Sequence, residues 1–245
     1  IAGADEAHSI GETEMRRLVH LTAAIVLALV TVSASGQDWL QSIVRVECGR
    51  GIGTGTLVAR YEQDGQQGGY VLTCKHVVEE GPACVVVWNN GYRANGYVDV
   101  RGERYDTALI RVAPSAEAAV LPVADDPAPV NVTVQVFGYG GQYNQSVNSL
   151  RLMRGEVKVR GYEEFGNEIR IVCDPWCMSG DSGGPIVFQG KVVGIISGYN
   201  PQRRDTRGPH YQPIRNLLRT VLPHGIVAGV DALRAQRAAC PPGGT

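Results

Sequence analysis

Residues 178–187 read MSGDSGGPIV and place three glycines around Asp181 and Ser182. Glycine loses more conformational entropy on folding than any other residue, so such a cluster needs a structural reason. One reason is a tight turn before the apolar run that Pro185 begins. The other is a loop that presents Ser182 outward and directs backbone N–H groups to one point. Residues elsewhere in the chain discriminate between the two.

Short apolar runs separated by Gly, Asn and Asp clusters make up most of the chain. They form two sets of about six strands each, divided by a Pro- and Ala-rich stretch at residues 113–130. Residues 213–222 begin with proline and have helical apolar spacing. This pattern predicts an all-β chain, as two antiparallel barrels or a sandwich, with a helix at the end.

A serine becomes a good nucleophile only with a base in hydrogen-bond reach and a third group that orients the base. LTCKHVVEE (72–80) puts His76 at the end of an apolar strand, and RYDTALIRV (104–112) puts Asp106 just before another. Alone, such a histidine is more often structural and such an aspartate more often a turn residue. Both lie in the first strand set and Ser182 in the second, so a cleft between two barrels would bring them together.

TCKHVV, YDTALI and SGDSGGP resemble the three catalytic blocks of trypsin-like (chymotrypsin-fold) serine peptidases, and in particular their compact bacterial branch. The GTGTLV stretch at residues 53–58 adds to this likeness, which covers about residues 40–222. The resemblance implies two six-stranded antiparallel β-barrels packed together, with a C-terminal helix and an active site between the barrels.

The resemblance also implies a role for each residue. Ser182 attacks the scissile carbonyl, His76 takes and returns the proton, and Asp106 orients the imidazole. The backbone N–H groups of Gly180 and Ser182 form the oxyanion hole. In trypsin-type zymogens a new N-terminus pairs with the acid before the serine, here Asp181. Whether Asp181 has such a partner or is satisfied locally stays open at this point.

Substrate-binding residues follow from the same resemblance. GIISGYN resembles the strand that lines the family's substrate cleft, so Ser197, Gly198 and Tyr199 are expected to bind an extended peptide. Trp176 stands six residues before Ser182, at the expected floor of the specificity pocket. Trypsin-type specificity needs an acid there, and Asp174 is out of register, so we do not expect a preference for basic residues.

Residues 15–36 read as a secretory signal, with a charged start, an apolar core and small residues at its end. The core is short for a membrane span, although a retained anchor is the alternative. We therefore expect secretion or a periplasmic location. The expected organisation is an upstream segment (1–14), a signal (15–36), a first barrel (37–123), a second barrel with helix (124–222) and a tail (223–245).

All six cysteines follow the candidate signal. An even count in an exported chain predicts disulfides, and six cysteines allow 15 pairings. Cys173 with Cys177 and Cys74 with Cys84 are two plausible pairs. A zinc site is the competing interpretation, which the lack of a CxxC pair disfavours.

Charge and composition limit the partners. The 23 basic and 24 acidic residues give a net charge of −1, so there is no basic excess of the kind that nucleic-acid binding needs. We expect a protein or peptide substrate, no metal or cofactor, no stable membrane association after signal cleavage, and a monomer.

Two other function classes remain as alternatives. A catalytically silent relative would bind peptides in the same cleft, although such relatives usually lack a member of the triad. Gly180–Gly184 also matches the G-x-S-x-G elbow of serine esterases on another fold. Those enzymes have the order Ser, Asp, His, whereas both partners precede Ser182 here.

Overall fold

The computed structural model describes residues 38–63, 66–115, 118–141, 151–166 and 168–221. The chain divides into two compact units, residues 1–38 and 39–245. Asp38 is the one described residue of the first unit, so the candidate signal, the upstream segment, the tail and Cys240 lie outside the described residues. No helix within the described part of the chain is both long and apolar enough to cross a membrane.

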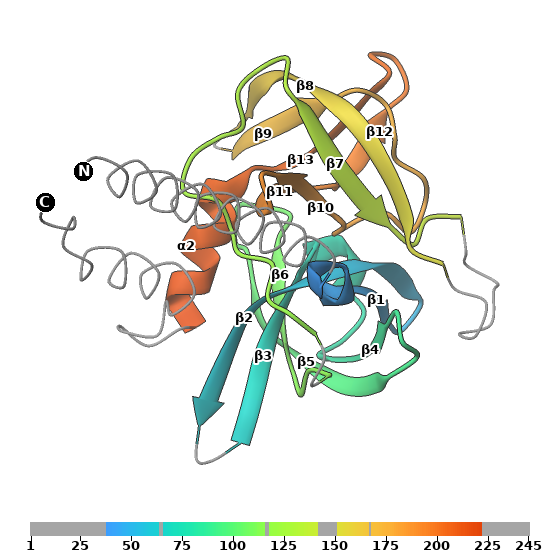
Figure 1. Ribbon diagram of the computed structural model, residues 1–245, viewed down its shortest axis with the longest axis vertical. Helices are drawn as coiled ribbons and strands as arrows, with labels where there is room; N and C mark the ends of the chain where they lie inside the picture. Colours follow the sequence, from blue (N-terminus) through green and yellow to red (C-terminus); the bar gives the residue numbers. More distant parts are fainter. Residues whose placement is uncertain (1–37, 64–65, 116–117, 142–150, 167, 222–245) are drawn as a thin grey trace, which may run out of the picture. The chain divides into compact units, whose positions relative to one another are not determined.

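The first strand set closes on itself as an antiparallel barrel, drawn in blue to green in Figure 1. Closure leaves no free strand edge. Neighbours around the barrel follow the order β1-β2-β3-β6-β5-β4. The strands are β1 (Ile43–Cys48), β2 (Gly51–Gln63), β3 (Gln66–Thr73), β4 (Ala83–Trp88), β5 (Arg93–Arg101) and β6 (Ala108–Val112), with short 3-10 helices η1 (Asp38–Ser42) and η2 (Lys75–Val78).

The second strand set forms one antiparallel sheet in the order β11-β10-β7-β8-β9-β13-β12. Its strands are β7 (Thr133–Gly138), β8 (Met153–Phe165), β9 (Glu168–Cys173), β10 (Pro185–Phe188), β11 (Lys191–Ile195), β12 (Gly198–Asn200) and β13 (Asp205–Pro209). A bridge between Gly194 of β11 and His210 curls the sheet toward a second barrel. The described strands number seven rather than six, because regular pairing is interrupted at Ile196 and Ser197, between β11 and β12.

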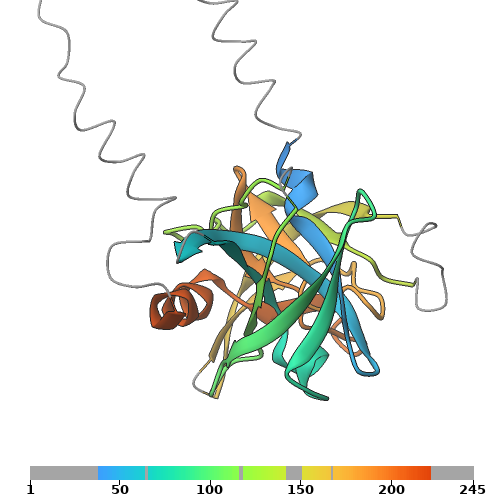
Figure 2. The same cartoon turned by 90° about the horizontal axis from the view of Figure 1, so that it is seen from below.

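The helix α2 (Tyr211–Val221) lies to one side of the strands in both views (Figures 1 and 2). It contacts β5 and β6 of the barrel and β11 of the sheet. Ile214 and Leu217 are buried in the same apolar cluster as the barrel interior. Arg215 forms an ion pair with Asp125, which fixes the helix to the chain that crosses between the two strand sets. The predicted all-β fold with a C-terminal helix is confirmed.

The segment that crosses between the two strand sets is hydrogen-bonded to both of them. Leu121 N–H donates to Leu57 O of β2 at 3.0 Å, and Ala124 N–H donates to Val192 O of β11 at 2.8 Å. Leu121 is fully buried. These contacts join the strand sets, and the proposed domain boundary at residues 123 and 124 within this segment stays a prediction.

The five described cysteines are all unpaired, so the expected disulfides Cys74–Cys84 and Cys173–Cys177 are absent. The thiol of Cys74 faces the second sheet and lies 3.1 Å from Ile196 O, whereas Cys84 is buried in the barrel. Cys173 is buried in β9, while the Cys177 thiol lies 3.6 Å from the neighbouring Met178 O. Neither of the two plausible pairs is formed, because the thiols of each pair face different surroundings.

We predict that Leu109→Ala destabilises the protein by about 2–5 kcal/mol, as for other large-to-small changes in a core. Leu109 is fully buried in β6, opposite Leu72 of β3 and Val100 of β5. Urea unfolding measures the loss. Arg111→Ala, an exposed change in the same strand, is the control and is expected to stay within about 0.5 kcal/mol. Equal effects of the two variants would contradict this account of the core.

Candidate active site

Strand pairing brings His76 and Asp106 together. Thr73, the last residue of β3, pairs with Ala108, the first residue of β6, so the chain after β3 meets the chain before β6 at one edge of the barrel. His76 Nδ1 lies 2.8 Å from Asp106 Oδ2, and the His76 backbone N–H donates to Asp106 Oδ1 at 3.1 Å. The carboxylate thus fixes both the imidazole and the backbone of the histidine.

The electrostatics of this pair favour a charged aspartate and a basic histidine. Burial alone would raise the pKa of Asp106, but hydrogen bonds from His76 and Ser197 outweigh burial and bring it to about 2. The hydrogen bond to Asp106 raises the pKa of His76 above its ordinary value, against the opposing effect of burial. Asp106 is therefore ionised at neutral pH and makes His76 a better proton acceptor.

Ser182 lies in the turn between β9 and β10, where the second sheet meets the barrel. Its carbonyl accepts a hydrogen bond from Thr54 N–H of β2 at 2.8 Å. Gly183 N–H donates to Ile196 O at 2.7 Å on the other side. The turn is therefore fastened to both strand sets.

Ser197 connects Ser182 with Asp106. The Ser182 hydroxyl lies 3.5 Å from Ser197 O, while the Ser197 hydroxyl donates a short hydrogen bond to Asp106 Oδ2. Among the described residues the Ser182 hydroxyl forms no hydrogen bond with His76. The structure thus brings the three predicted catalytic residues to one region, with His76 directly on Asp106 and Ser182 connected to them through Ser197.

The surroundings of Gly183 explain why the stretch around Ser182 needs glycine. Its φ is +87°, a backbone conformation that L side chains rarely adopt. A Cβ there would lie 2.1 Å from Thr54 O and 2.3 Å from Thr73 Oγ1. The turn approaches the barrel so closely that no side chain fits.

Gly180 also has a positive φ, +102°. Its carbonyl accepts a hydrogen bond from the Thr54 hydroxyl at 2.8 Å, and Thr54 Oγ1 in turn accepts one from Tyr139 N–H at 3.0 Å. Within the described chain the backbone N–H groups of Gly180 and Ser182 donate to no acceptor. Two unpaired donors beside a serine hydroxyl are what an anion-stabilising site requires.

Asp181 is fully buried and its carboxylate is satisfied by the backbone. Gly140 N–H and Met178 N–H each donate to it at 2.7 Å. Burial nevertheless raises its pKa, against the effect of those two hydrogen bonds. The sequence left open whether Asp181 pairs with a new N-terminus or with local groups. Within the described residues its partners are local N–H groups, which order the loop.

The other predicted substrate residues lie on the second sheet. Gly198 and Tyr199 belong to β12, which pairs only with β13 among the described strands. Trp176 is half-buried, and its backbone N–H donates a hydrogen bond to Thr206 Oγ1 at 2.9 Å. Its indole packs directly on Gly155 of β8, where a Cβ would lie 1.9 Å from Nε1. The close fit requires glycine at that position.

Asp174 is occupied elsewhere, because its carboxylate forms an ion pair with Arg160 at 2.7 Å. This agrees with its placement out of register in the sequence. Thr54 is a residue whose function the sequence reasoning missed, although it noted the GTGTLV stretch around it. Ser197 was assigned only to substrate, and its hydrogen bond to Asp106 was not foreseen. No pattern in the sequence identifies the hydrogen-bond partner of a serine or threonine hydroxyl.

One cluster of metal-ligating groups occurs in the part of the chain that the structure describes. Donor atoms of Cys74, His76 and Asp106 lie within 4.8 Å of one another. Burial, the largest cause, raises the pKa of the Cys74 thiol well above its ordinary value, which disfavours the thiolate that a metal needs. The facing atoms of His76 and Asp106 are already hydrogen-bonded to each other. The cluster therefore suits proton transfer better than metal binding.

Comparison with known proteins identifies relatives of this arrangement. A family model for the trypsin-like peptidase domain matches residues 53–195, a range that contains His76, Asp106 and Ser182. A protein of Rhizobium meliloti named as a probable periplasmic serine endoprotease, DegP-like, is 28% identical over 152 residues. The match covers 58% of this chain but 29% of that protein, so the chain spans less than a third of its relative's length.

Solved structures of proteases share the fold. The active form of the Rv3671c protease from M. tuberculosis superposes with a TM-score of 0.61 at 20% identity, covering 74% of this chain and 80% of that one. A serine endoprotease from Yersinia pestis gives 0.61 at 17% identity, covering 78% of this chain and 66% of that one. At these identities the likeness concerns the fold.

We predict that Gly183→Ala destabilises the protein more than Gly190→Ala. Both glycines have positive φ, but the space around Gly190 is open, whereas Gly183 touches Thr54 and Thr73. Gly190→Ala is expected to cost about 1–2 kcal/mol from backbone strain alone, and Gly183→Ala a further 1–3 kcal/mol, roughly, from overpacking. Chemical unfolding of the two variants measures the difference, and equal losses would refute the close approach of the turn.

Proposed function

The chain belongs to the trypsin-like peptidase family, and from this premise we propose that it is an exported serine endopeptidase with Ser182, His76 and Asp106 as its catalytic triad. The observation that carries the proposal is the joined arrangement of these residues. Asp106 holds His76 at 2.8 Å, and Ser197 contacts both Asp106 and Ser182. A half-buried, hydrogen-bonded carboxylate that holds a half-exposed imidazole near a serine is the arrangement that a catalytic triad requires.

The proposed mechanism begins with the Ser182 hydroxyl. Rotation about its χ1 angle carries Oγ from Ser197 O to the imidazole, because catalytic hydrogen bonds are often long in the absence of substrate. Oγ then attacks the scissile carbonyl as His76 Nε2 takes its proton. Asp106 keeps the proton of Nδ1 in place and stabilises the imidazolium that forms.

The tetrahedral intermediate places negative charge on the carbonyl oxygen. We assign its stabilisation to the backbone N–H groups of Gly180 and Ser182, which are unpaired within the described residues. His76 then returns the proton to the leaving amine, and water releases the acyl group from Ser182 by the same steps in reverse. The hydrogen bond from Gly141 N–H to Ser179 O supports this arrangement, because it holds the Ser179–Gly180 peptide, whose N–H must face the substrate.

The proposed substrate is an extended polypeptide. The three residues of β12 leave one strand edge unpaired among the described strands, and a peptide can pair with such an edge by β-addition. Trp176 remains the candidate floor of the specificity pocket. Because Asp174 is held by Arg160, we expect no preference for Lys or Arg at the cleaved bond.

Export is part of the proposal on two grounds. Residues 15–36 have the composition of a secretory signal, and the Rhizobium meliloti relative is named as periplasmic. Sequencing the N-terminus of the protein secreted by a bacterial host tests this assignment. A mature start near residues 35–37 is expected, and retention of residues 15–36 would contradict cleavage.

The deciding experiment is labelling with a fluorophosphonate probe, which reacts only with an activated serine. We expect the probe on Ser182, no labelling of Ser182→Ala, and normal labelling of Ser179→Ala, an exposed serine in the same loop. Mass spectrometry of the digest locates the adduct, and cleavage of a peptide library then reports the preferred residue. A folded protein that does not react would instead be a latent zymogen or a silent relative that only binds peptides.

The pH dependence of activity tests the role of Asp106. Only neutral His76 accepts a proton, and its pKa is raised, so kcat/KM is expected to fall with acid at a midpoint above about 6.5. Asp106→Asn removes the carboxylate, which lowers the pKa of His76 and cuts kcat by about 10⁴-fold. Asp126→Asn, an exposed change, is the control. An unaltered pH profile in Asp106→Asn would exclude Asp106 from the triad.

A further inference from the structure

Cys48 and Cys84 face each other inside the barrel, away from the candidate active site. Glu47 of β1 pairs with Val85 of β4, so the next pair along these antiparallel strands is Cys48 with Cys84. Both side chains are buried, with exposed fractions of 0% and 4%. Cross-strand neighbours have Cα atoms about 4.5–5.5 Å apart, within the range that a disulfide spans.

Contacts of the two sulfur atoms agree with this placement. Cys48 Sγ lies 3.4 Å from Ala83 O, the carbonyl next to Cys84, and 3.5 Å from Gly81 O. Burial, followed by the hydrogen bond with Cys48, raises the pKa of the Cys84 thiol. The Cys84 thiol therefore touches the Cys48 thiol.

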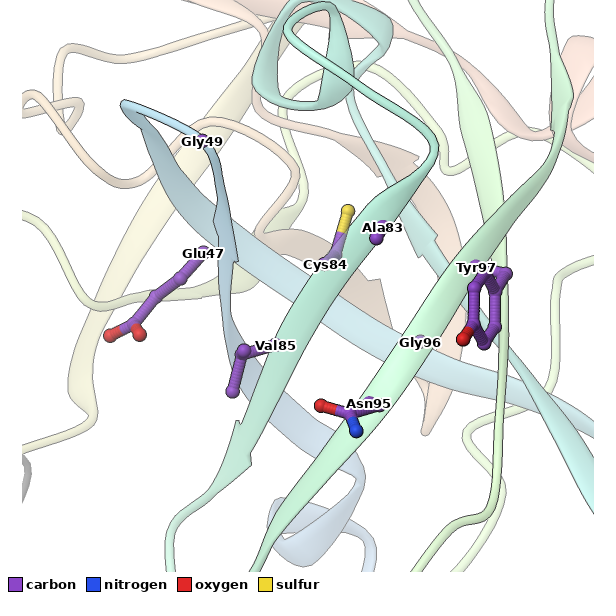
Figure 3. A pocket seen from close by; sticks show the side chains of 8 residues that line it. All are labelled: Glu47, Gly49, Ala83, Cys84, Val85, Asn95, Gly96 and Tyr97. Atoms are coloured by element: carbon purple, nitrogen blue, oxygen red, sulfur yellow. The ribbon is translucent and has the colours of Figure 1, made fainter.

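A cavity of about 460 Å³ lies on the barrel beside this pair. Figure 3 shows Cys84 on β4 between Gly49, in the β1–β2 turn, and Tyr97 on β5. The remaining lining residues come from β1, β4 and β5, and none belongs to the candidate active site. The cavity is large enough for a small molecule, and Cys84 is one of its lining residues, although the Cys84 side chain is buried.

We propose that Cys48 and Cys84 form a redox-active dithiol that a low-molecular-weight disulfide converts to an intramolecular disulfide between β1 and β4. Cys84 loses its proton to water, and its sulfur attacks the oxidant, releasing one thiolate and forming a mixed disulfide. Cys48, also deprotonated, then attacks the Cys84 sulfur and releases the second thiolate. The two cysteines lose two electrons and two protons, and the oxidant is reduced to two thiols.

The new bond would fasten the end of β1 to the start of β4, across the segment that contains η2 and His76. Cross-linking restricts the unfolded chain and stabilises the fold. For a loop that runs from residue 48 to 84, the expected effect is a decrease in the unfolding equilibrium constant by about 10²–10³-fold. Oxidation of Cys48 and Cys84 would thus change the stability of the fold without involving the proposed catalytic residues.

Tryptic mapping of the full chain tests the proposal directly, after reduction and treatment with oxidised glutathione. Remaining thiols are alkylated, and the protein is digested without reductant. Cys48 falls in peptide 46–50, Cys84 in 76–93 and Cys74 in 61–75, so each pairing has its own mass. We expect peptides 46–50 and 76–93 linked to each other. Recovery of both as alkylated peptides, as glutathione adducts, or linked to any other cysteine would overturn the proposal.

Variants give a second measurement. Oxidation should raise the guanidinium midpoint of the wild type and of Cys173→Ala, a control at another buried cysteine, but not of Cys84→Ala. An equal shift in Cys84→Ala would assign the stabilisation to another bond and refute this one. No readout depends on peptidase activity, so the inference can fail while the proposed function holds, and the reverse.

Discussion

The hydrogen bonds of Thr54 link the two strand sets at the point where the chemistry is proposed. Its backbone N–H holds the carbonyl of Ser182, its hydroxyl holds the carbonyl of Gly180, and Tyr139 N–H donates to that hydroxyl. One residue of the barrel therefore fixes both ends of the Ser182 turn. Because His76 and Asp106 belong to the barrel and Ser182 to the sheet, their mutual distance depends on this joint.

The interior of the Ser182 turn is built around a buried carboxylate. A charge without a partner is costly in a protein interior, so a buried carboxylate needs hydrogen-bond donors. Asp181 accepts hydrogen bonds from two backbone N–H groups of different segments. Gly138 and Gly140 surround it so closely that a Cβ on either would lie 2.2 or 2.5 Å from Asp181 Oδ1. Packing and hydrogen bonding together order the loop, without any ion pair from within the described residues.

Much of the fold was predictable from local pattern. The alternating apolar runs and the apolar spacing of the final helix have local causes, and the structure contains both, although the helix begins at Tyr211, two residues before Pro213. The motifs around His76, Asp106 and Ser182 indicated where to look for chemistry. The sequence could not give the register of β3 on β6, on which the His76–Asp106 contact depends.

Features that depend on long-range contacts were the ones missed. The seventh strand arises from an interruption at Ser197, and that residue turns back to bond Asp106. The two cysteine pairs that the sequence made plausible are absent from the structure. Cys48 faces Cys84 through the pairing of β1 with β4, which no spacing of cysteines reveals.

The shortness of β12 has a consequence for solubility. An exposed strand edge invites pairing with other copies of a protein, and short edge strands limit that tendency. β12 has three residues, and the turn that follows it carries Arg203 and Arg204, which are exposed. We propose that this edge holds one extended peptide, while its short length and the adjacent positive charge oppose the edge-to-edge strand pairing by which β-rich proteins aggregate.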